Sequence, residues 1–247
     1  MKDRQGRVPR LYVDTELGPH ASLALPEAAA HHAARVLRLR EGELVLLFNG
    51  RGGEYEARLS MPGRAQVVAR IGAKLDVERE SPLFVTLVQA VTSSEKMDFT
   101  IQKAVELGVA AIHPVLASRS LVRLSDEREA RKLAHWRRVA IAACEQCGRN
   151  RIPDIALPEQ LDRYHPAESG AKILLSPSGV AGLAAFATSP VALAVGPEAG
   201  FSEAEESLLQ RAGFVAVRLG PRILRTETAA LAALAALNAI AGDFQLP

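Results

Sequence analysis

The sequence has 247 residues and a formal net charge of +2, with 48% hydrophobic and 23% charged residues. This composition is that of a folded globular protein, and it argues against a disordered or fibrous chain. No apolar run reaches the roughly 18 residues of a membrane span; the nearest, Ala229 to Ala241, is short and mostly alanine. Because no apolar segment follows the basic N-terminus, a secretory signal is not expected, and the expected location is cytoplasmic.

The first 74 residues are rich in short strand-like segments. The segment 26–42 is expected to be helical, from its alanines and from the spacing of Val36 and Leu39. Strands are expected where β-favouring residues lie between Gly, Pro or Asn, at residues 10–13, 43–49, 53–60 and 65–72. Strands this short and this closely spaced predict a small barrel.

After a charged segment near residues 74–82, strands and helices alternate. The strands are expected at residues 84–92, 111–117, 172–175, 191–195 and 214–219, with helices at 96–108 and from Asp126 to Cys147. Such alternation predicts a mostly parallel sheet covered by helices. We place the domain boundary between residues 74 and 75.

Three loops follow the carboxyl ends of the last three strands. They are SPSG after Leu175, GPEAGF after Val195 and GPRILRTET after Leu219. Ligands of open α/β sheets bind beyond these strand ends, so the three loops together predict a pocket. Neither a GxGxxG pattern nor a phosphate-binding P-loop is present. A pocket built from backbone groups and apolar side chains, with few charges, is expected to suit a purine and a thioether better than a triphosphate.

Two of these loops lead into helices. Ser202 and Glu205 form a capping box, which predicts a helix from Glu203 to about Gly213. In the last loop, Arg222 and Arg225 supply fixed positive charges suited to a phosphate or to an anionic base edge. The next two residues are assigned to the following helix, Thr226 as its cap and Glu227 in its first turn.

The basic residues are unevenly distributed. The first ten residues contain Lys2, Arg4, Arg7 and Arg10, and residues 119–151 contain nine basic and four acidic residues. Local basic patches favour a polyanionic partner. The lone CxxC pair, Cys144 and Cys147, has no second pair of metal ligands after it. We therefore interpret it as two small residues in the last turns of a helix.

Taken together, several segments resemble a known family. The matching segments are HHAARVLRLREG, KMDFTIQKAVELGV, CEQCGR, VGPEAGFSEAE and LGPRILRTETA. They resemble the ribosomal RNA small-subunit uracil-N3 methyltransferases of the SPOUT superfamily, over nearly the whole chain. One departure is Ala199, where the family usually has a glycine. An alanine is strained at that position if the backbone there requires a positive φ.

The resemblance implies a fold and a function. It implies an α/β fold, with a PUA-like β-barrel RNA-binding domain over residues 1–74 and a trefoil-knotted SPOUT methyltransferase domain over 75–247. It also implies homodimers that use S-adenosylmethionine, without a metal or a membrane, to methylate N3 of a specific uridine in 16S ribosomal RNA of the small subunit. The apolar, small-sided segment 229–241 independently indicates a helix packed closely on two sides.

The matched motifs also imply site residues. Either Arg222 or Arg225 is expected to stabilise the uracil anion, and the sequence does not choose between them. Glu198 and Glu227 are proton-acceptor candidates for which bracing or capping is the main expectation. The expected cofactor contacts are Leu175, Ser176, Gly196, Pro197, Glu198, Gly200, Leu219, Gly220, Ile223, Leu224, Arg225 and Thr226. The expected RNA contacts are Arg10, His32, Arg35, Arg38, Lys96, Lys103 and Arg119.

Three alternatives compete with this interpretation. A ribose 2′-O-methyltransferase of the same superfamily is disfavoured by the near full-length match to the uracil-N3 signatures. A noncatalytic RNA-binding or assembly factor is disfavoured because binding alone does not require the intact loops. A nicotinamide oxidoreductase is disfavoured because the dinucleotide pattern is missing.

Overall fold

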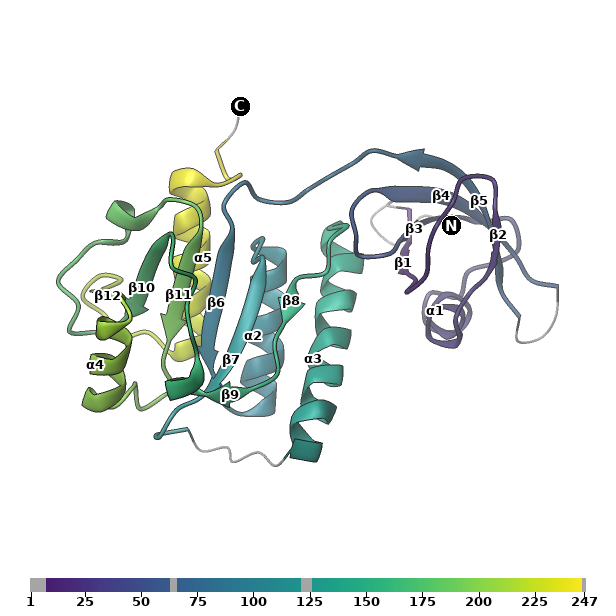
Figure 1. The fold of residues 1–247 in the computed structure, drawn as a ribbon. Helices are drawn as coiled ribbons and strands as arrows, with labels where there is room; N and C mark the ends of the chain where they lie inside the picture. The colour runs from purple at the N-terminus through teal and green to yellow at the C-terminus, as the bar shows by residue number, and fades with distance from the viewer. Residues whose placement is uncertain (1–7, 63–65, 121–125, 246–247) are drawn as a thin grey trace. The chain divides into compact units, whose positions relative to one another are not determined.

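The computed structural model describes residues 8–62, 66–120 and 126–245, which form two compact units (Figure 1). The first unit consists of the chain up to Glu80 together with Cys144–Ile152, and the second of Ser81–Ala143 and the chain from Pro153 onward. The domain boundary after residue 74 stays a prediction. The return of segment 144–152 to the first unit was not predicted. None of the described helices is long and apolar enough to cross a membrane.

The first unit contains one five-stranded sheet in the order β1-β3-β4-β5-β2. Its inward side chains, among them Leu11, Leu47 and Leu59, form a continuous core. Four of the strands were predicted, and β2 was missed. The bounds are β1 Arg10–Tyr12, β2 Ser22–Ala24, β3 Leu44–Phe48, β4 Glu54–Ser60 and β5 Val68–Leu75.

The helix predicted over residues 26–42 is shorter and irregular. It begins as α1 (Glu27–His31) and continues as one π-helical turn, η1 (His32–Val36). Two residues later Arg38 has a φ of +54°, a left-handed conformation that is uncommon outside glycine. The chain therefore leaves the helix well before residue 42.

The second unit is built on a parallel sheet in the order β12-β10-β11-β6-β7-β8, with β9 also pairing to β7. The predicted parallel sheet is confirmed, and the two-residue strands β8 and β9 are additions to it. The bounds are β6 Val85–Ala90, β7 Ala111–Leu116, β8 Asp154–Ile155, β9 Glu159–Gln160, β10 Ala171–Leu175, β11 Val191–Val195 and β12 Val215–Val217.

Helices cover both faces of this sheet (Figure 1). α5 (Thr226–Ala241) packs on β6, β11 and α2 (Ser94–Glu106). On the other face, α4 (Glu203–Arg211) contributes Leu209 to a core with Val88 and Ala194. The long helix α3 has the predicted bounds, Asp126–Cys147.

The strand order explains where a site forms. β12, β10 and β11 are neighbours, and all three are parallel, so their carboxyl ends lie along one edge. The three predicted loops leave from these ends. The next strand, β6, leads at the same edge into the first turn of α2.

Candidate active site

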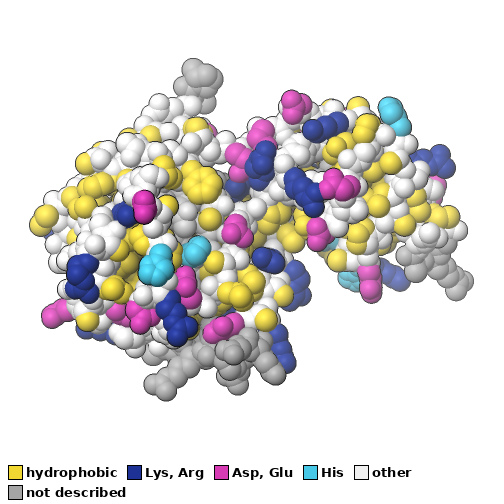
Figure 2. All heavy atoms as spheres, in the orientation of Figure 1, with side chains coloured by type: hydrophobic (Ala, Val, Ile, Leu, Met, Phe, Trp, Pro, Cys, Tyr) yellow, Lys and Arg dark blue, Asp and Glu magenta, His cyan; other side chains and the backbone are white. Residues whose placement is uncertain are grey.

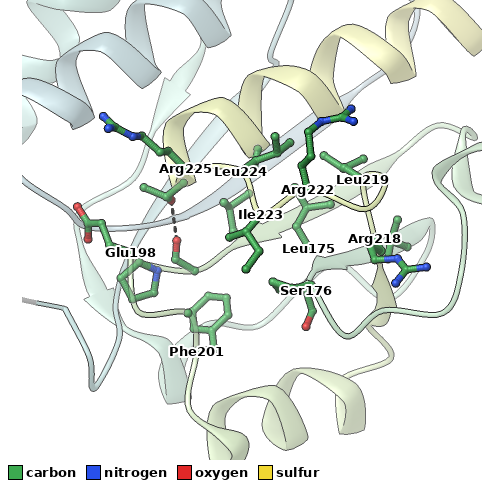
Figure 3. Close-up of a pocket in the computed structure, with 18 of the residues that line it drawn as sticks. Leu175, Ser176, Glu198, Phe201, Arg218, Leu219, Arg222, Ile223, Leu224 and Arg225 are labelled. Carbon is green, nitrogen blue, oxygen red and sulfur yellow. Dashed lines mark hydrogen bonds between the residues drawn. The ribbon is translucent and has the colours of Figure 1, made fainter.

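A cavity of about 370 Å³ lies at the carboxyl ends of β10, β11 and β12 (Figure 3). Its wall contains the apolar side chains of Leu175, Pro197, Phe201, Ile223 and Leu224. The volume is in the range of small-molecule sites, which are mostly apolar with a few placed polar groups. The cavity is therefore a candidate ligand site.

The loop after β11 makes a tight bend around two glycines. A Cβ at Gly196 would lie 3.0 Å from the backbone nitrogen of Phe201, so a larger residue does not fit there without a shift. Gly200 has a φ of +68°, and its N–H donates to the carbonyl of Pro197 at 2.8 Å. Ala199 is not among the described residues with positive φ. Alanine in place of the usual glycine is therefore not strained.

Thr226 connects this loop to α5. Its hydroxyl donates to the carbonyl of Gly196 at 2.6 Å and accepts from the Gln89 side-chain amide at 3.1 Å. The prediction that Thr226 caps α5 is wrong, because the N-cap is Arg225 and no side chain caps the helix. The Thr226 hydroxyl instead donates to the Gly196 carbonyl in the loop after β11. The capping box of Ser202 and Glu205 is confirmed.

One end of the cavity is charged. Lys96 Nζ lies 2.8 Å from Glu198 Oε1, and both residues line the cavity. The hydrogen bond to Glu198 raises the pKa of Lys96. Burial is the largest single influence on Glu198 and acts to raise its pKa, but the hydrogen bond from Lys96, a backbone hydrogen bond and the Lys96 charge together outweigh it, and the pKa is lowered. In Figure 3, Arg225 extends on the Glu198 side of the pocket, whereas Arg222 extends toward the side of Leu219.

The other end of the cavity also carries polar groups. Ser176 is buried, and its hydroxyl donates to Glu206 Oε1 at 3.2 Å. Arg218 lines the same cavity. The pocket thus combines an apolar centre with carboxylates and cations at its ends.

The structure brings most of the predicted cofactor residues together. Eleven of the twelve line the cavity, and Gly220 instead occupies a turn with a φ of +74°. Both candidate arginines line it as well. Contact with a cofactor stays a prediction for all of them. The lining residues that sequence reasoning missed are Pro177, Val195, Phe201, Glu206, Val217, Arg218 and Ala229.

The predicted RNA residues of the second unit have several placements. Lys96 lines the cavity, and Lys103 Nζ lies 2.7 Å from Glu106 Oε1 within α2. Arg119 donates to backbone carbonyls of the loop after β11. On the face shown in Figure 2, Lys and Arg side chains are interspersed with Asp and Glu rather than gathered in one patch.

The predicted RNA residues of the first unit range from a buried side chain to exposed ones. The guanidinium of Arg10 is turned inward, bonded to Glu54 and to Asn150 Oδ1. His32 Nε2 lies 3.9 Å from a carboxylate oxygen of Glu145. Arg35 and Arg38 are exposed on and just after η1. Lys2, Arg4 and Arg7 lie outside the described residues. RNA contact stays a prediction throughout.

The two cysteines lie in the last turns of α3, as predicted, and neither is in a disulfide. Burial raises the pKa of the Cys144 thiol to about 12, so it is un-ionised at neutral pH. Within the described ranges, no group of three or more His, Cys, Asp or Glu side chains is arranged to hold a metal ion.

Comparison with known proteins assigns the family. The model of an RNA methyltransferase domain matches residues 79–238, and that of an RNA methyltransferase PUA domain matches residues 25–72. Ribosomal RNA small subunit methyltransferase E of Buchnera aphidicola is 32% identical and covers 97% of this chain and 96% of its own length. The Bacillus subtilis protein of the same name is 31% identical, covering 84% of this chain and 86% of its own length.

Solved structures agree. Ribosomal RNA small subunit methyltransferase E from Neisseria gonorrhoeae, bound to S-adenosyl methionine, is 40% identical with a TM-score of 0.92, covering 97% of this chain and all of that chain. A protein from Legionella pneumophila, solved in complex with the same cofactor, is 41% identical with a TM-score of 0.93, covering 96% and 100%. The chain, an α/β protein with an N-terminal PUA domain and a methyltransferase domain, belongs to the ribosomal RNA small subunit methyltransferase E family.

Proposed function

We propose that this protein transfers the methyl group of S-adenosylmethionine to N3 of a uridine in 16S ribosomal RNA of the small subunit. The observation that carries the proposal is the cavity at the ends of β10, β11 and β12, with its apolar centre and charged ends. Family membership supplies the class of substrate. The choice of N3 rests on the resemblance of the loops VGPEAGFSEAE and LGPRILRTETA to the uracil-N3 signatures.

The lining residues fit this methyl donor. Leu175, Leu219 and Ile223 offer apolar surface for a purine, and backbone groups of the loops are available to its polar edge. Glu198 and Glu206 face a ligand that carries a sulfonium and an ammonium, and Arg218 suits its carboxylate. When bound, the donor supplies an electrophilic methyl group on sulfur and leaves as a thioether.

The residues at the end of the cavity that contains Lys96 and Glu198 act on the base. Uracil N3 must release its proton to water as the methyl group leaves the sulfur, so a negative charge develops on the ring before the new N–C bond is complete. Arg225 and Lys96, on the same side of the pocket as Glu198, stabilise that charge and increase the acidity of the N3–H. Holding base and donor in line supplies the rest of the rate enhancement.

The proposal extends to the first unit and to the assembly. The PUA domain, residues 1–74, binds RNA through exposed basic side chains such as Arg35 and Arg38. The π-helical turn and the left-handed Arg38 support this, because unusual backbone conformations concentrate at functional sites. The methyltransferase domain, residues 75–247, is knotted and forms a homodimer. The protein acts in the cytoplasm.

The test uses purified protein, labelled S-adenosylmethionine and small subunits that lack the modification. Reverse transcription maps the product, because a methyl group on N3 blocks the Watson–Crick edge and stops the copying enzyme. We expect label in 16S RNA and one new stop at a uridine. Subunits that already carry the methyl group are the control and should accept no label. Label without a stop indicates ribose methylation instead. Donor binding without label indicates a noncatalytic role.

A further inference from the structure

The loop after β7 lies against the loop after β11. One nitrogen of the Arg119 guanidinium, Nη1, donates to the carbonyl of Ala199 at 3.1 Å and to that of Phe201 at 3.2 Å. The sequence motifs predicted an RNA contact for Arg119. In the structure the same positive charge is directed at the backbone of the pocket.

The two carbonyls lie on either side of Gly200. That glycine has the positive φ of the bend, and its N–H closes the turn onto Pro197. A hydrogen bond from an ionised donor is roughly twice as strong as one between neutral groups. A single cation shared by the carbonyls of Ala199 and Phe201 therefore fixes the backbone on both sides of the bend.

Ser118, the residue before Arg119, also joins the loop after β7 to the segment that follows β11. The Ser118 N–H and hydroxyl donate to the Glu205 carboxylate at 2.6 and 3.0 Å. Glu205 also accepts from the backbone and hydroxyl of Ser202, at 2.8 and 2.9 Å, in the capping box. The loop after β7 thus holds both the bend and the start of α4.

The bend shapes the cavity wall. Pro197 and Phe201 line the cavity, and Phe201 is 5% exposed, packed in the core with Leu209 and Phe214. If the bend loosens, both side chains lose their positions. A ligand must then order the loop as it binds, which weakens its affinity.

We propose that Arg119 is a positioning residue for the methyl-donor pocket: by bridging the carbonyls of Ala199 and Phe201, it holds the loop 196–201 in the shape that binds the donor. The inference rests on the proposed function for the identity of the ligand. Arg119 is not among the residues that line the cavity, and it acts through the loop.

The test compares three variants of the full chain. Arg119→Gln removes the charge, Arg119→Lys keeps it, and Arg137→Gln is the matched control on the exposed surface of α3. Calorimetry measures the Kd for S-adenosylmethionine. We expect Arg119→Gln to raise Kd about tenfold, the scale of one charge-assisted hydrogen bond. Arg119→Lys should recover part of this loss, and Arg137→Gln should leave Kd unchanged.

Two further readouts separate positioning from other roles. At saturating donor, kcat and the KM for small subunits should stay within twofold of wild type in Arg119→Gln, because bound donor reorders the loop. The opposite split overturns the inference: an unchanged donor Kd, a raised KM for subunits and a salt dependence reduced by about one phosphate contact. An unchanged Kd with unchanged kinetics overturns it too.

Hydrogen exchange tests the bridge without any ligand. The Gly200 amide is bonded to Pro197, and its exchange should become about tenfold faster in Arg119→Gln if that bend opens locally. Unchanged exchange contradicts the bridge. Wild-type protein that binds no S-adenosylmethionine contradicts the proposed function instead, and the exchange result still decides whether Arg119 holds the loop.

Discussion

Thr226 and Gly196 are joined by a hydrogen bond of 2.6 Å, from the threonine hydroxyl to the glycine carbonyl. Thr226 begins α5, and Gly196 begins the loop after β11. The Gln89 amide at the end of β6 donates to the same hydroxyl at 3.1 Å. Two successive bonds therefore join three elements beside the cavity. Because Thr226 and Gln89 are buried, water does not replace these bonds when they are lost.

We predict that Thr226→Val destabilises the protein by about 1–3 kcal/mol, because the Gly196 carbonyl loses the hydroxyl that donates to it and the Gln89 amide keeps only its bond to the Ala90 carbonyl. The same change should weaken donor binding, since the second and third loops are no longer joined. Chemical denaturation and calorimetry measure the two effects. Thr226→Ser keeps the hydroxyl and should stay close to wild type in both. Wild-type behaviour of the valine variant would show that the bond has no role.

The two loop arginines should differ in their effect on turnover. Arg225 lies on the Glu198 side of the pocket with Lys96, and Arg222 extends toward Leu219. Arg225→Ala should lower the single-turnover rate at least about a hundredfold, the scale of a lost charge-stabilising donor, with donor Kd changed only a few-fold. Arg222→Ala should lower the rate less than about tenfold. Equal losses would refute the assignment of the base to this end of the pocket.

The bend at Gly200 gives a matched pair of substitutions. Apart from its two chain neighbours, no atom of the described residues lies within 4 Å of a Cβ built at Gly200, so the penalty of Gly200→Ala comes from its φ of +68°. That penalty is about 1–2 kcal/mol, and we expect a donor Kd raised about tenfold. Ala199→Gly, at a position with ordinary φ, should change Kd less than threefold, about 0.6 kcal/mol. If Ala199→Gly changes the donor Kd more than Gly200→Ala does, the conformation of the bend depends on residue 199 instead.

The elements that the sequence predicts best are those with strong local signals. Asp126–Cys147 repeats its apolar residues over six turns, and the Ser202–Glu205 capping box determines where α4 begins. β8 and β9 were missed because two residues are too few to form a local pattern, and β2 was missed because Ser22–Ala24 contains no β-branched or aromatic residue. The predicted helix over residues 26–42 failed because a π-helical turn has no distinct signature in the sequence.

The same division holds for the site. Three loops after three strands predicted the pocket because the ends of adjacent parallel strands lie at one edge. The partners of charged side chains were not predictable. The sequence predicted RNA contacts for Arg10 and Arg119, but it did not indicate that Arg10 bonds Glu54 and Asn150 inside the first unit or that Arg119 bonds the carbonyls of Ala199 and Phe201. Thr226 is of a residue type that often caps helices, and only the fold brings the Gly196 carbonyl to its hydroxyl.

Arg10 and its carboxylate partner lead to a prediction about acid stability. Glu54 is 2% exposed and accepts from Arg10 and, at 3.3 Å, from Arg79. Burial acts to raise the pKa of Glu54, but the two guanidinium groups outweigh it, and the pKa falls below its ordinary value of 4.5. Between the folded pKa of Glu54 and its ordinary pKa of 4.5, the unfolded chain therefore binds more protons than the folded one. The stabilisation is complete above about pH 4.5 and is lost as the pH falls through the folded pKa.

Glu54→Gln should accordingly lower the free energy of unfolding at pH 7 by about 3 kcal/mol, because it leaves the buried Arg10 without its counter-charge. The difference between wild type and this variant should shrink as the pH is lowered below about 4. Denaturant titrations at several pH values measure it. Glu16→Gln is the matched control, since Glu16 pairs with Arg51 but is 79% exposed, and it should change stability by less than about 1 kcal/mol. A Glu54→Gln difference that is independent of pH would mean that the loss comes from packing, since a lost ion pair must follow the titration of its carboxylate.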